Sequence, residues 1–519
     1  MEITVFCLFM FIIVSIRLSS LILSQRLFKI ILFVIAIFCI REAFLGIIYF
    51  SKVWRWNSTL YPITGSFLNS GPYGGFMAIC ICLIFPACFK NSYEQHENII
   101  QKLLFWFLYV SAISALIILP ATQSRSALLA LCCSSVAYVF SSKRLKTKAI
   151  NVLKKAWMWL LPSFLIVCIG AYLFKKPSAD GRFFIDKISI KAMVNNEGKG
   201  VGAHHFGGAY GETQFQYFSN QILENGSDEL DWKAIDEHER LTSDCPEYAF
   251  NEYLNMGVEA GPTAMALFIF VIFFAIVISL KRGTIWCYGL ISFAVFSLFS
   301  YPLQCIQFRI LFPVLLACSF FDGLRLMQNK RWALISIYAI AFLSFSAYFI
   351  HQIPLLKKQR EIEASWNNVR KWYKKEFYDY VVEDCDSLLP YMNNDREFLF
   401  DYGHSLNLTG NYAKSDSILI IGTKISCDPM FWNIMGNNSL SQGKFREAEE
   451  CYKHAFYMVP NRLYPLYLLA KMYYIERDTT SFLDITEKVE SFIPKIENTK
   501  TEKMRSEIND LKESVLGSF

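Results

Sequence analysis

The sequence predicts an all-α protein: a polytopic membrane bundle of about ten helices with a large polar loop and a C-terminal domain of helical repeats. Apolar residues make up 54% of the 519-residue chain, and charged residues make up only 18%. The apolar residues are concentrated before His351, in runs of roughly 20, the length of a helix that crosses a bilayer. After that point the chain becomes charged and takes on a helical-repeat pattern.

The membrane helices are predicted from these apolar runs. The runs lie at 3–23, 27–50, 72–89, 103–122, 126–140, 156–174, 261–280, 284–301, 305–321 and 332–350. The first run lacks the basic start and the small-residue cleavage site of a signal peptide, so we expect it to be retained as a span. Together the runs define a membrane domain at 1–350.

Lysine and arginine fall in alternate loops between the spans. These loops lie at 26–29, 90–102, 143–155, 281–282 and 325–331. Short cytoplasmic loops retain basic residues, so the five loops are predicted to share the cytoplasmic side. The large loop at 175–260 and the C-terminal domain at 351–519 then lie on the opposite face. The net charge of +6 comes from the inside loops and gives no reason to expect a nucleic-acid partner.

The C-terminal domain carries the spacing of a tetratricopeptide-like repeat. Small and aromatic residues occupy the characteristic offsets, at Trp432, Gly436, Ala448, Tyr452, Ala455 and Pro460. Gly403 precedes Gly436 by 33 residues, so the pattern extends toward the N-terminus. Two to three helical hairpins are therefore predicted within 361–489. Such domains bind peptides or proteins, or pack on their own membrane domain, and we expect a protein partner here.

Cysteine usage predicts neither a metal site nor a disulfide framework. Most of the 15 cysteines lie in the apolar runs, where they behave as small apolar residues. No Cys-x-x-Cys pair is present, and we expect no metal and no cofactor. Four cysteines lie outside the spans, and we expect free thiols rather than a disulfide at Cys245, Cys385, Cys427 and Cys451.

The polar loop at 175–260 is the predicted location of an active site. Uninterrupted loops of this length are usually functional or disordered, and aromatic residues occur throughout this one. Arg125 precedes the fifth span and Arg182 follows the sixth, both on the face of the large loop. Either arginine alone could be an interfacial anchor. Two forked guanidinium groups can together hold a diphosphate without a metal.

The end of this loop is predicted to form an amphipathic helix over 248–259 that stops at Gly261 and Pro262. One arc of that helix carries Tyr248, Asn251, Glu252, Asn255 and Glu259. This face could meet only water, or it could present two carboxylates and two amides to a cavity. Glycines surround His204 and His205, and they indicate backbone freedom because no phosphate-loop pattern fits.

With these motifs the chain resembles the O-antigen ligase and polymerase superfamily of bacterial membrane glycosyltransferases. The resemblance covers 62–321 and depends on the order of short motifs: Thr64-Gly65-Ser66-Phe67-Leu68-Asn69, Ser124-Arg125-Ser126-Ala127, Gly181-Arg182, Gly200-Val201-Gly202, and Ala249-Phe250-Asn251-Glu252-Tyr253-Leu254 with Glu259-Ala260-Gly261. Members take a glycan from a polyprenyl diphosphate carrier on the outer face of the inner membrane. They pass it to a lipid A core sugar, another glycan or a protein hydroxyl. The resemblance implies a multi-pass inner-membrane protein whose large loop and C-terminal domain are periplasmic.

The resemblance also implies roles for individual residues. Arg125 and Arg182 match arginines that engage the donor diphosphate, whose developing charge they would stabilise. Asn69, Asn251 and Asn255 are expected to bind substrate. The implied reaction is an inverting, metal-independent glycan transfer.

The general base is left open. Many ligases of the family carry His directly before the Asn of the last motif, but here that position is Phe250. The acceptor hydroxyl must still lose its proton, which requires a His or a carboxylate within hydrogen-bond reach. In order of preference, the candidates are Glu252, Glu259, and then His204 and His205.

Three alternatives stay open. A polymerase or a protein O-oligosaccharyltransferase of the same family differs from a ligase only in its acceptor. A lipid-linked glycan transporter would need the arginines and a cleft but no base, and its working residues should lie inside spans, as Arg41, Glu42 and Arg309 do. A non-enzymatic assembly scaffold would use the repeats and treat the membrane domain as an anchor.

Overall fold

The computed structural model describes residues 21–51, 61, 63–91, 99–142, 145–147, 170, 176–196, 198–224, 230–321 and 358–517. Every regular element in these ranges is helical, which confirms the predicted all-α class. The predicted spans at 3–23, 156–174 and 332–350 lie almost wholly outside the described residues.

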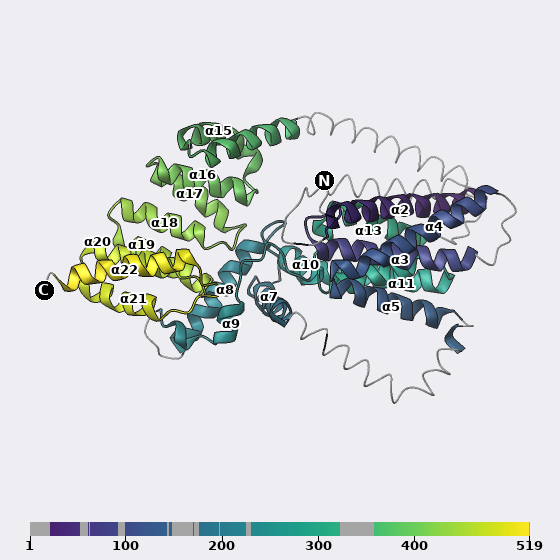
Figure 1. The fold of residues 1–519 in the computed structure, drawn as a ribbon, viewed down its shortest axis with the longest axis horizontal. Coiled ribbons are helices and arrows are strands. Elements are labelled where there is room, and N and C mark those ends of the chain that lie inside the picture. Colours follow the sequence, from purple (N-terminus) through teal and green to yellow (C-terminus); the bar gives the residue numbers. More distant parts are fainter. Residues whose placement is uncertain are drawn as a thin grey trace. The chain divides into compact units, whose positions relative to one another are not determined.

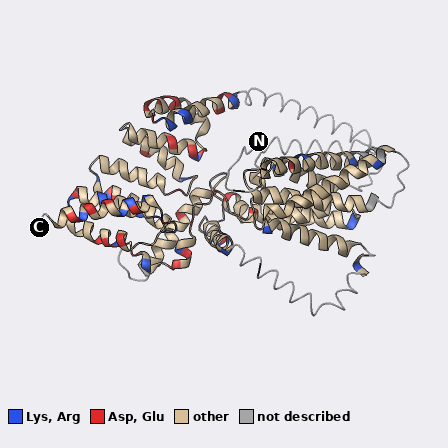
Figure 2. Cartoon of the chain, in the orientation of Figure 1, with Lys and Arg blue, Asp and Glu red and all other residues tan. Residues whose placement is uncertain are grey.

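The chain forms two compact units. The membrane unit comprises Met1–Lys175, Phe250–Tyr253 and Met265–Ile353. The repeat unit comprises Lys176–Ala249, Leu254–Ala264 and Pro354–Phe519. The segment expected as a large loop of the membrane domain therefore groups with the C-terminal helices. Charged side chains are sparse on the helices of the membrane unit and frequent on those of the repeat unit (Figure 2).

The described membrane helices follow the apolar runs (Figure 1). They are α2 (Leu21–Phe50), α3 (Ser70–Asn91), α4 (Ile99–Ile118), α5 (Arg125–Ser141), α11 (Pro262–Arg282), α12 (Trp286–Ser297) and α13 (Ile306–Phe321), with 3-10 turns η1 (Leu119–Thr122) and η3 (Pro302–Gln304). Apolar runs form helices in a bilayer because backbone groups find no partner there except within their own helix. The helix α2 already begins at Leu21, so the basic loop expected at 26–29 is helical instead.

Four helices in the described part are long and apolar enough to cross a membrane, fewer than the ten predicted. They are Phe28–Phe50, Ser70–Phe89, Lys102–Thr122 and Pro262–Arg282. The apolar helices α5, α12 and α13 are shorter. The span predicted at 284–301 is reduced to α12, which ends at Ser297, and Pro302 starts the separate turn η3. The long helices make this a membrane protein.

The helix α3 lies at the centre of the membrane unit. It packs against α2, α4, α5 and α12. Its apolar window is 89% buried, whereas that of α11 is 17% buried. The exposed side chains of α11, such as Leu267, Phe270 and Phe273, are large and apolar. Such a surface is suited to contact with the acyl chains of a bilayer.

The C-terminal part of the repeat unit is a series of helical hairpins. A helix at 358–374 is followed by α15 (Tyr378–Met392), α16 (Arg396–Leu408), α17 (Tyr412–Thr423), α18 (Met430–Ser441), α19 (Phe445–Met458), α20 (Tyr464–Glu476), α21 (Thr479–Ser491) and α22 (Thr499–Leu516). The pairs α16/α17, α18/α19 and α20/α21 pack closely. The hairpins predicted within 361–489 are therefore present.

Glycines at matching positions allow the helices of a hairpin to approach. A Cβ added at Gly436 would lie 2.4 Å from the ring of Tyr452, and one added at Gly403 would lie 2.5 Å from Leu419. Each glycine is on the first helix of its hairpin and its neighbour is on the second. The 33-residue spacing thus reflects one recurring contact between paired helices.

The polar segment at 176–249 is mostly helical. It contains α7 (Lys176–Asn195), α8 (Phe206–Glu224), the turn η2 (Trp232–Ala234) and α9 (Glu237–Thr242). The helix α8 packs against α19 of the repeats. The next helix, α10 (Glu252–Ala260), ends before Gly261 as predicted but starts four residues later than Tyr248, because Asn251 caps it: the Asn251 side chain accepts a hydrogen bond from the Tyr253 amide, 3.1 Å away.

We expect Gly436→Ala to destabilise the repeat unit by about 1 to 3 kcal/mol, because the new methyl group would overlap the Tyr452 ring and force the hairpin apart. The midpoint of denaturant unfolding of the purified protein measures this. As a control, Gly181→Ala in α7 has its nearest neighbour at 4.0 Å and should be neutral or stabilising by up to about 1 kcal/mol. Equal midpoints for Gly436→Ala and the wild type would contradict the close-packing explanation.

Candidate functional site

A buried carboxylate organises the first motif segment in the membrane unit. Glu42 of α2 is 1% exposed. Its two carboxylate oxygens accept hydrogen bonds from the amide and the hydroxyl of Ser66, at 2.9 and 2.8 Å. Gly65 has a positive φ of 55°, and a Cβ there would lie 2.8 Å from the same carboxylate. A carboxylate inside a membrane bundle is costly unless it is hydrogen-bonded, so this contact fixes the 64–66 turn.

Asn69 lies at the start of α3 and joins two parts of the chain. Its side-chain carbonyl accepts a hydrogen bond from the Gly71 amide, at 2.8 Å. Its amide nitrogen donates to the hydroxyls of Tyr61 and Tyr301, both at 3.2 Å. The ring of Tyr301 packs edge-on against Phe250, with centroids 5.3 Å apart. Tyr301 therefore connects the first motif segment to the last.

The segment that carries Arg125 docks on the same end of α3. Ser124 is the N-cap of α5: its hydroxyl accepts from the Ala127 amide and donates to the Gly71 carbonyl, each at 3.4 Å. A Cβ on Gly74 would lie 2.7 Å from the Thr122 hydroxyl. The 122–125 turn and Asn69 thus share one end of the membrane unit.

The first turn of α10 completes this cluster. Glu252 is 2% exposed, and its carboxylate accepts a hydrogen bond from the Leu303 amide at 3.0 Å. The Tyr253 hydroxyl donates to the Ala294 carbonyl at 2.9 Å. The preferred base candidate therefore holds the turn that presents Tyr301. Sequence reasoning overlooked Tyr301, whose only signal was its position beside a proline between two apolar runs.

The glycine-rich segment closes around the other end of α10. The amides of Val201 and Gly202 donate to the carbonyls of Val258 and Glu259, at 3.0 and 2.9 Å. Gly200 has a φ of 74°, and a Cβ there would meet the Glu259 carbonyl at 2.6 Å. The predicted backbone freedom is used here, because Gly198, Gly200 and Gly202 have positive φ angles, and the missing side chain of Gly200 also permits a contact that no larger residue allows.

Two of the predicted residues meet beside this loop. The Glu259 carboxylate accepts a hydrogen bond from the His204 amide at 2.9 Å, and His204 has a positive φ of 65°. Both residues line a cavity of about 250 Å³ whose other wall is formed by Asp395, Arg396 and Glu397 at the start of α16. A strained residue beside a cavity is typical of a functional site.

Two further candidates contact the backbone nearby. The ring nitrogen Nδ1 of His205 lies 2.9 Å from the Ala203 carbonyl. Asn255 is 2% exposed and accepts a hydrogen bond from the Ala249 amide at 3.3 Å. The expected arc of polar residues facing one cavity is therefore wrong: Glu252 and Asn255 are buried, and Glu259 alone of the arc's two carboxylates lines this cavity.

Arg182 belongs to α7 in the repeat unit, while Arg125 belongs to the membrane unit. One turn after Arg182, burial raises the pKa of Asp186 to about 6, against the opposing effect of the Arg182 charge. One carboxylate oxygen of Asp186 is buried without a hydrogen-bond partner among the described residues. Neighbouring Asp180 pairs with His238 at 3.1 Å. In the described residues, His, Cys, Asp and Glu form no group of three suited to a metal.

No protein-family model and no curated protein matches this chain.

The raised pKa of Asp186 predicts how stability depends on pH. The folded protein binds this proton more tightly than the unfolded chain, so the contribution is largest below the ordinary pKa of Asp and is lost as pH rises through about 6. We expect Asp186→Asn to raise the melting temperature at pH 7.5 and to have a smaller effect at pH 4.5. The exposed control Asp484→Asn should show no such pH-dependent difference. A melting temperature of Asp186→Asn below wild type at pH 7.5 would contradict the assignment.

Proposed function

We propose that this chain is a membrane glycosyltransferase that moves a glycan from a polyprenyl diphosphate carrier to an acceptor hydroxyl on the periplasmic face of a bacterial inner membrane. One observation carries the proposal: three motif segments that are far apart in the sequence meet at one end of the membrane unit. Ser124 contacts Gly71, Asn69 contacts Tyr301, and Tyr301 contacts Phe250. Loops that only connect spans have no need of such mutual contacts.

Arg125 has the local surroundings that an anion requires. It is the first residue of α5, directly after the N-cap Ser124. The amides of a first helical turn and the helix dipole favour negative charge. The forked guanidinium adds two charge-assisted hydrogen bonds. We assign Arg125 to the diphosphate that leaves during transfer, and Arg182, which belongs to the repeat unit, keeps the same role as a prediction from the sequence.

Of the two carboxylates on α10, Glu259 suits the base better. Glu252 is buried and holds the Leu303 amide, which fits a positioning residue. Glu259 is half-buried and faces the cavity beside His204, where an acceptor hydroxyl can reach it. In the proposed step the acceptor oxygen bonds to the anomeric carbon, the bond from that carbon to the diphosphate oxygen breaks with its electron pair, and the hydroxyl proton passes to Glu259. This order of the two glutamates reverses the sequence-based preference.

Two ionisable residues inside the described spans favour a transferase over a transporter. Glu42 holds the 64–66 turn, and Arg309 donates to the Leu303 carbonyl. Both side chains therefore stabilise connecting segments.

A ligase, a polymerase and a protein O-oligosaccharyltransferase would share this chemistry and differ in acceptor. Product formation from a lipid-linked glycan by the purified protein, with lipid A core, glycan and protein acceptors compared, tests the proposal and separates these activities. Movement of the donor across the membrane without product would support a transporter instead.

We expect Arg125→Ala and Arg182→Ala each to lower transfer by about 10²- to 10³-fold, because each loses one charge-assisted contact to the leaving diphosphate. Arg→Lys at either position should restore only part of the rate, since an ammonium lacks the bidentate fork. The matched control is Arg446→Ala, which removes a guanidinium that is 91% exposed. A near-normal rate in either alanine variant would return that arginine to an anchoring role.

The two glutamates are expected to differ in kind. Glu259→Gln should lower kcat with little change in donor binding, and it should remove the acid limb of the pH profile of transfer. Glu252→Gln should lower thermal stability because it weakens the hydrogen bond to Leu303, while the acid limb stays. Retention of both the rate and the acid limb in Glu259→Gln would refute this assignment and leave the histidines as candidates.

A further inference from the structure

The cavity beside Glu259 lies next to a second one. The second cavity has a volume of about 370 Å³, compared with about 250 Å³ for the first. The two share the residues Arg396, Glu397, Ser426 and Cys427. Small-molecule sites typically occupy about 300 to 1,000 Å³, so the two cavities together are large enough for a short oligosaccharide. Both lie wholly within the repeat unit.

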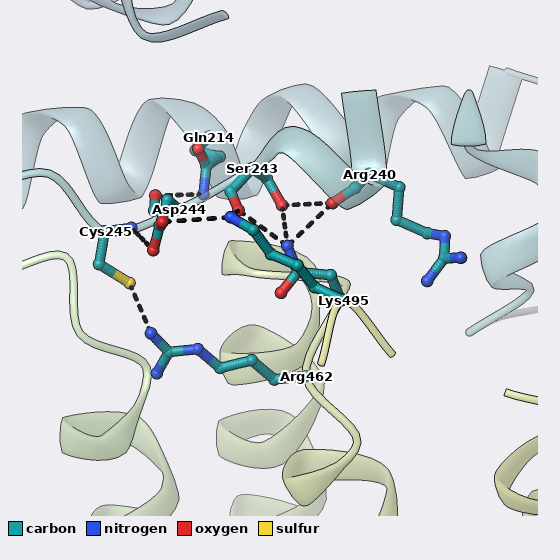
Figure 3. A network of polar contacts seen from close by, with 8 residues as sticks. Gln214, Arg240, Ser243, Asp244, Cys245, Arg462 and Lys495 are labelled. Atoms are coloured by element: carbon teal, nitrogen blue, oxygen red, sulfur yellow. Dashed lines mark hydrogen bonds and ion pairs between the residues drawn. The ribbon is translucent and has the colours of Figure 1, made fainter. Parts of the chain in front are cut away.

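One wall of the cavities is the segment after α9, and the repeats hold it in place (Figure 3). The side-chain amide of Asn461 donates to the carbonyls of Arg240 and Ser243, at 3.0 and 2.8 Å. Lys495 pairs with Asp244 at 3.2 Å. These contacts come from two turns between repeat helices, so the wall has a defined position only when the repeats are folded.

The same wall has further contacts along its length. Arg462 donates to the sulfur of Cys245 at 3.4 Å. The Cys427 thiol donates to the Pro246 carbonyl at 3.2 Å. Arg396 at the start of α16 forms an ion pair with Glu247. The wall residues 245–247 are therefore each fastened to a repeat residue, and the cavities are preorganised rather than formed by a loose loop.

The lining of the first cavity is polar and carries excess negative charge. Its carboxylates are Glu247, Glu259, Asp395 and Glu397, whereas Arg396 supplies its one guanidinium. Part of this charge is already satisfied, since Arg396 pairs with Glu247, Glu397 pairs with Arg370 at 3.2 Å and Asp395 caps α16. The second cavity adds the carboxylates of Asp244, Asp401 and Asp428 and the guanidinium groups of Arg370 and Arg462, so carboxylates outnumber guanidinium groups over the two linings together. The remaining field opposes an anionic ligand.

The chemistry of the lining suits sugar hydroxyls. The carboxylates of the lining can accept hydrogen bonds from sugar hydroxyls, and the side-chain amide of Asn394 can both donate and accept them. Tyr248, in the same lining, supplies an aromatic face that an apolar face of a pyranose can cover. Glu259, the proposed base, lies in this lining, so a sugar bound there would be the acceptor.

We propose that the two cavities form an acceptor-glycan subsite, built partly by the repeats, which binds neutral or amino-sugar ends and rejects anionic ones. This inference rests on the proposed function only where it calls the bound glycan the acceptor. The binding of a glycan to the cavities does not depend on that function. It gives the repeats a direct part in substrate recognition. Their loss would abolish transfer to every acceptor rather than to a recruited partner alone.

The test is the binding of three tetrasaccharides to the full-length protein in detergent, measured by calorimetry or saturation-transfer NMR. Chitotetraose and its de-N-acetylated form should bind, and tetragalacturonate should bind at least about tenfold more weakly. Tyr248→Ala should weaken chitotetraose binding by about tenfold or more through loss of the aromatic face. Asn394→Lys should reduce the difference in affinity between chitotetraose and tetragalacturonate. Glu450→Lys, the exposed control on α19, should leave that difference unchanged.

The outcomes separate this inference from the proposed function. Selective binding without any glycan transfer would keep the subsite and refute the transferase. Transfer that is unaffected by Tyr248→Ala and Asn394→Lys, with no tetrasaccharide bound, would refute the subsite and keep the transferase. Binding of tetragalacturonate with the same affinity as chitotetraose would refute the proposed rejection of anionic glycans. Thermal unfolding of each variant shows whether a lost signal reflects misfolding, and Tyr248→Phe, which keeps the aromatic face, should restore binding.

Discussion

The short helix α10 is held by hydrogen bonds at both ends, and the arrangement of the candidate site depends on this constraint. At its start, Asn251 caps the helix and Glu252 binds the Leu303 amide. At its end, the backbone of 201–202 binds the Val258 and Glu259 carbonyls. A helix of nine residues has little stability of its own. These outside partners therefore determine where its two carboxylates lie, about 10 Å apart along its axis.

The repeats are part of the folded site rather than an independent appendage. Arg240 of α9 is fully buried, donates to the Ile493 carbonyl at 2.8 Å, and lies over the rings of both Trp232 and Phe492. Burial lowers the pKa of this guanidinium. A buried charge is tolerated only where fixed dipoles and aromatic faces replace water. The segment that bears Arg240 would therefore lose its main supports if the repeats were removed.

The two carboxylates of α10 illustrate how one residue type serves two purposes. Glu252 is buried and accepts a hydrogen bond from the Leu303 amide, so its charge stabilises a turn. Glu259 faces a cavity and its carboxylate receives the His204 amide. Phe250 packs on Tyr301, which accepts a hydrogen bond from Asn69. The proposed base, Glu259, lies near the other end of α10, in the cavity whose other wall the repeats provide.

The sequence by itself determined the features that depend on neighbouring residues. Apolar runs predicted the helices of the membrane unit, the glycine spacing predicted the hairpins, and Gly261 with Pro262 marked the end of α10. The tertiary structure decided the features that join distant residues. Asn69 meets Tyr301 across 232 positions, Gly208 abuts the Lys424 backbone, and Glu252 is buried while Glu259 is not. The periodicity of a sequence shows which face of one helix is apolar. It does not show which distant segment of the chain covers a polar face. That segment decides whether a carboxylate is buried and positions the backbone or stays open to a substrate.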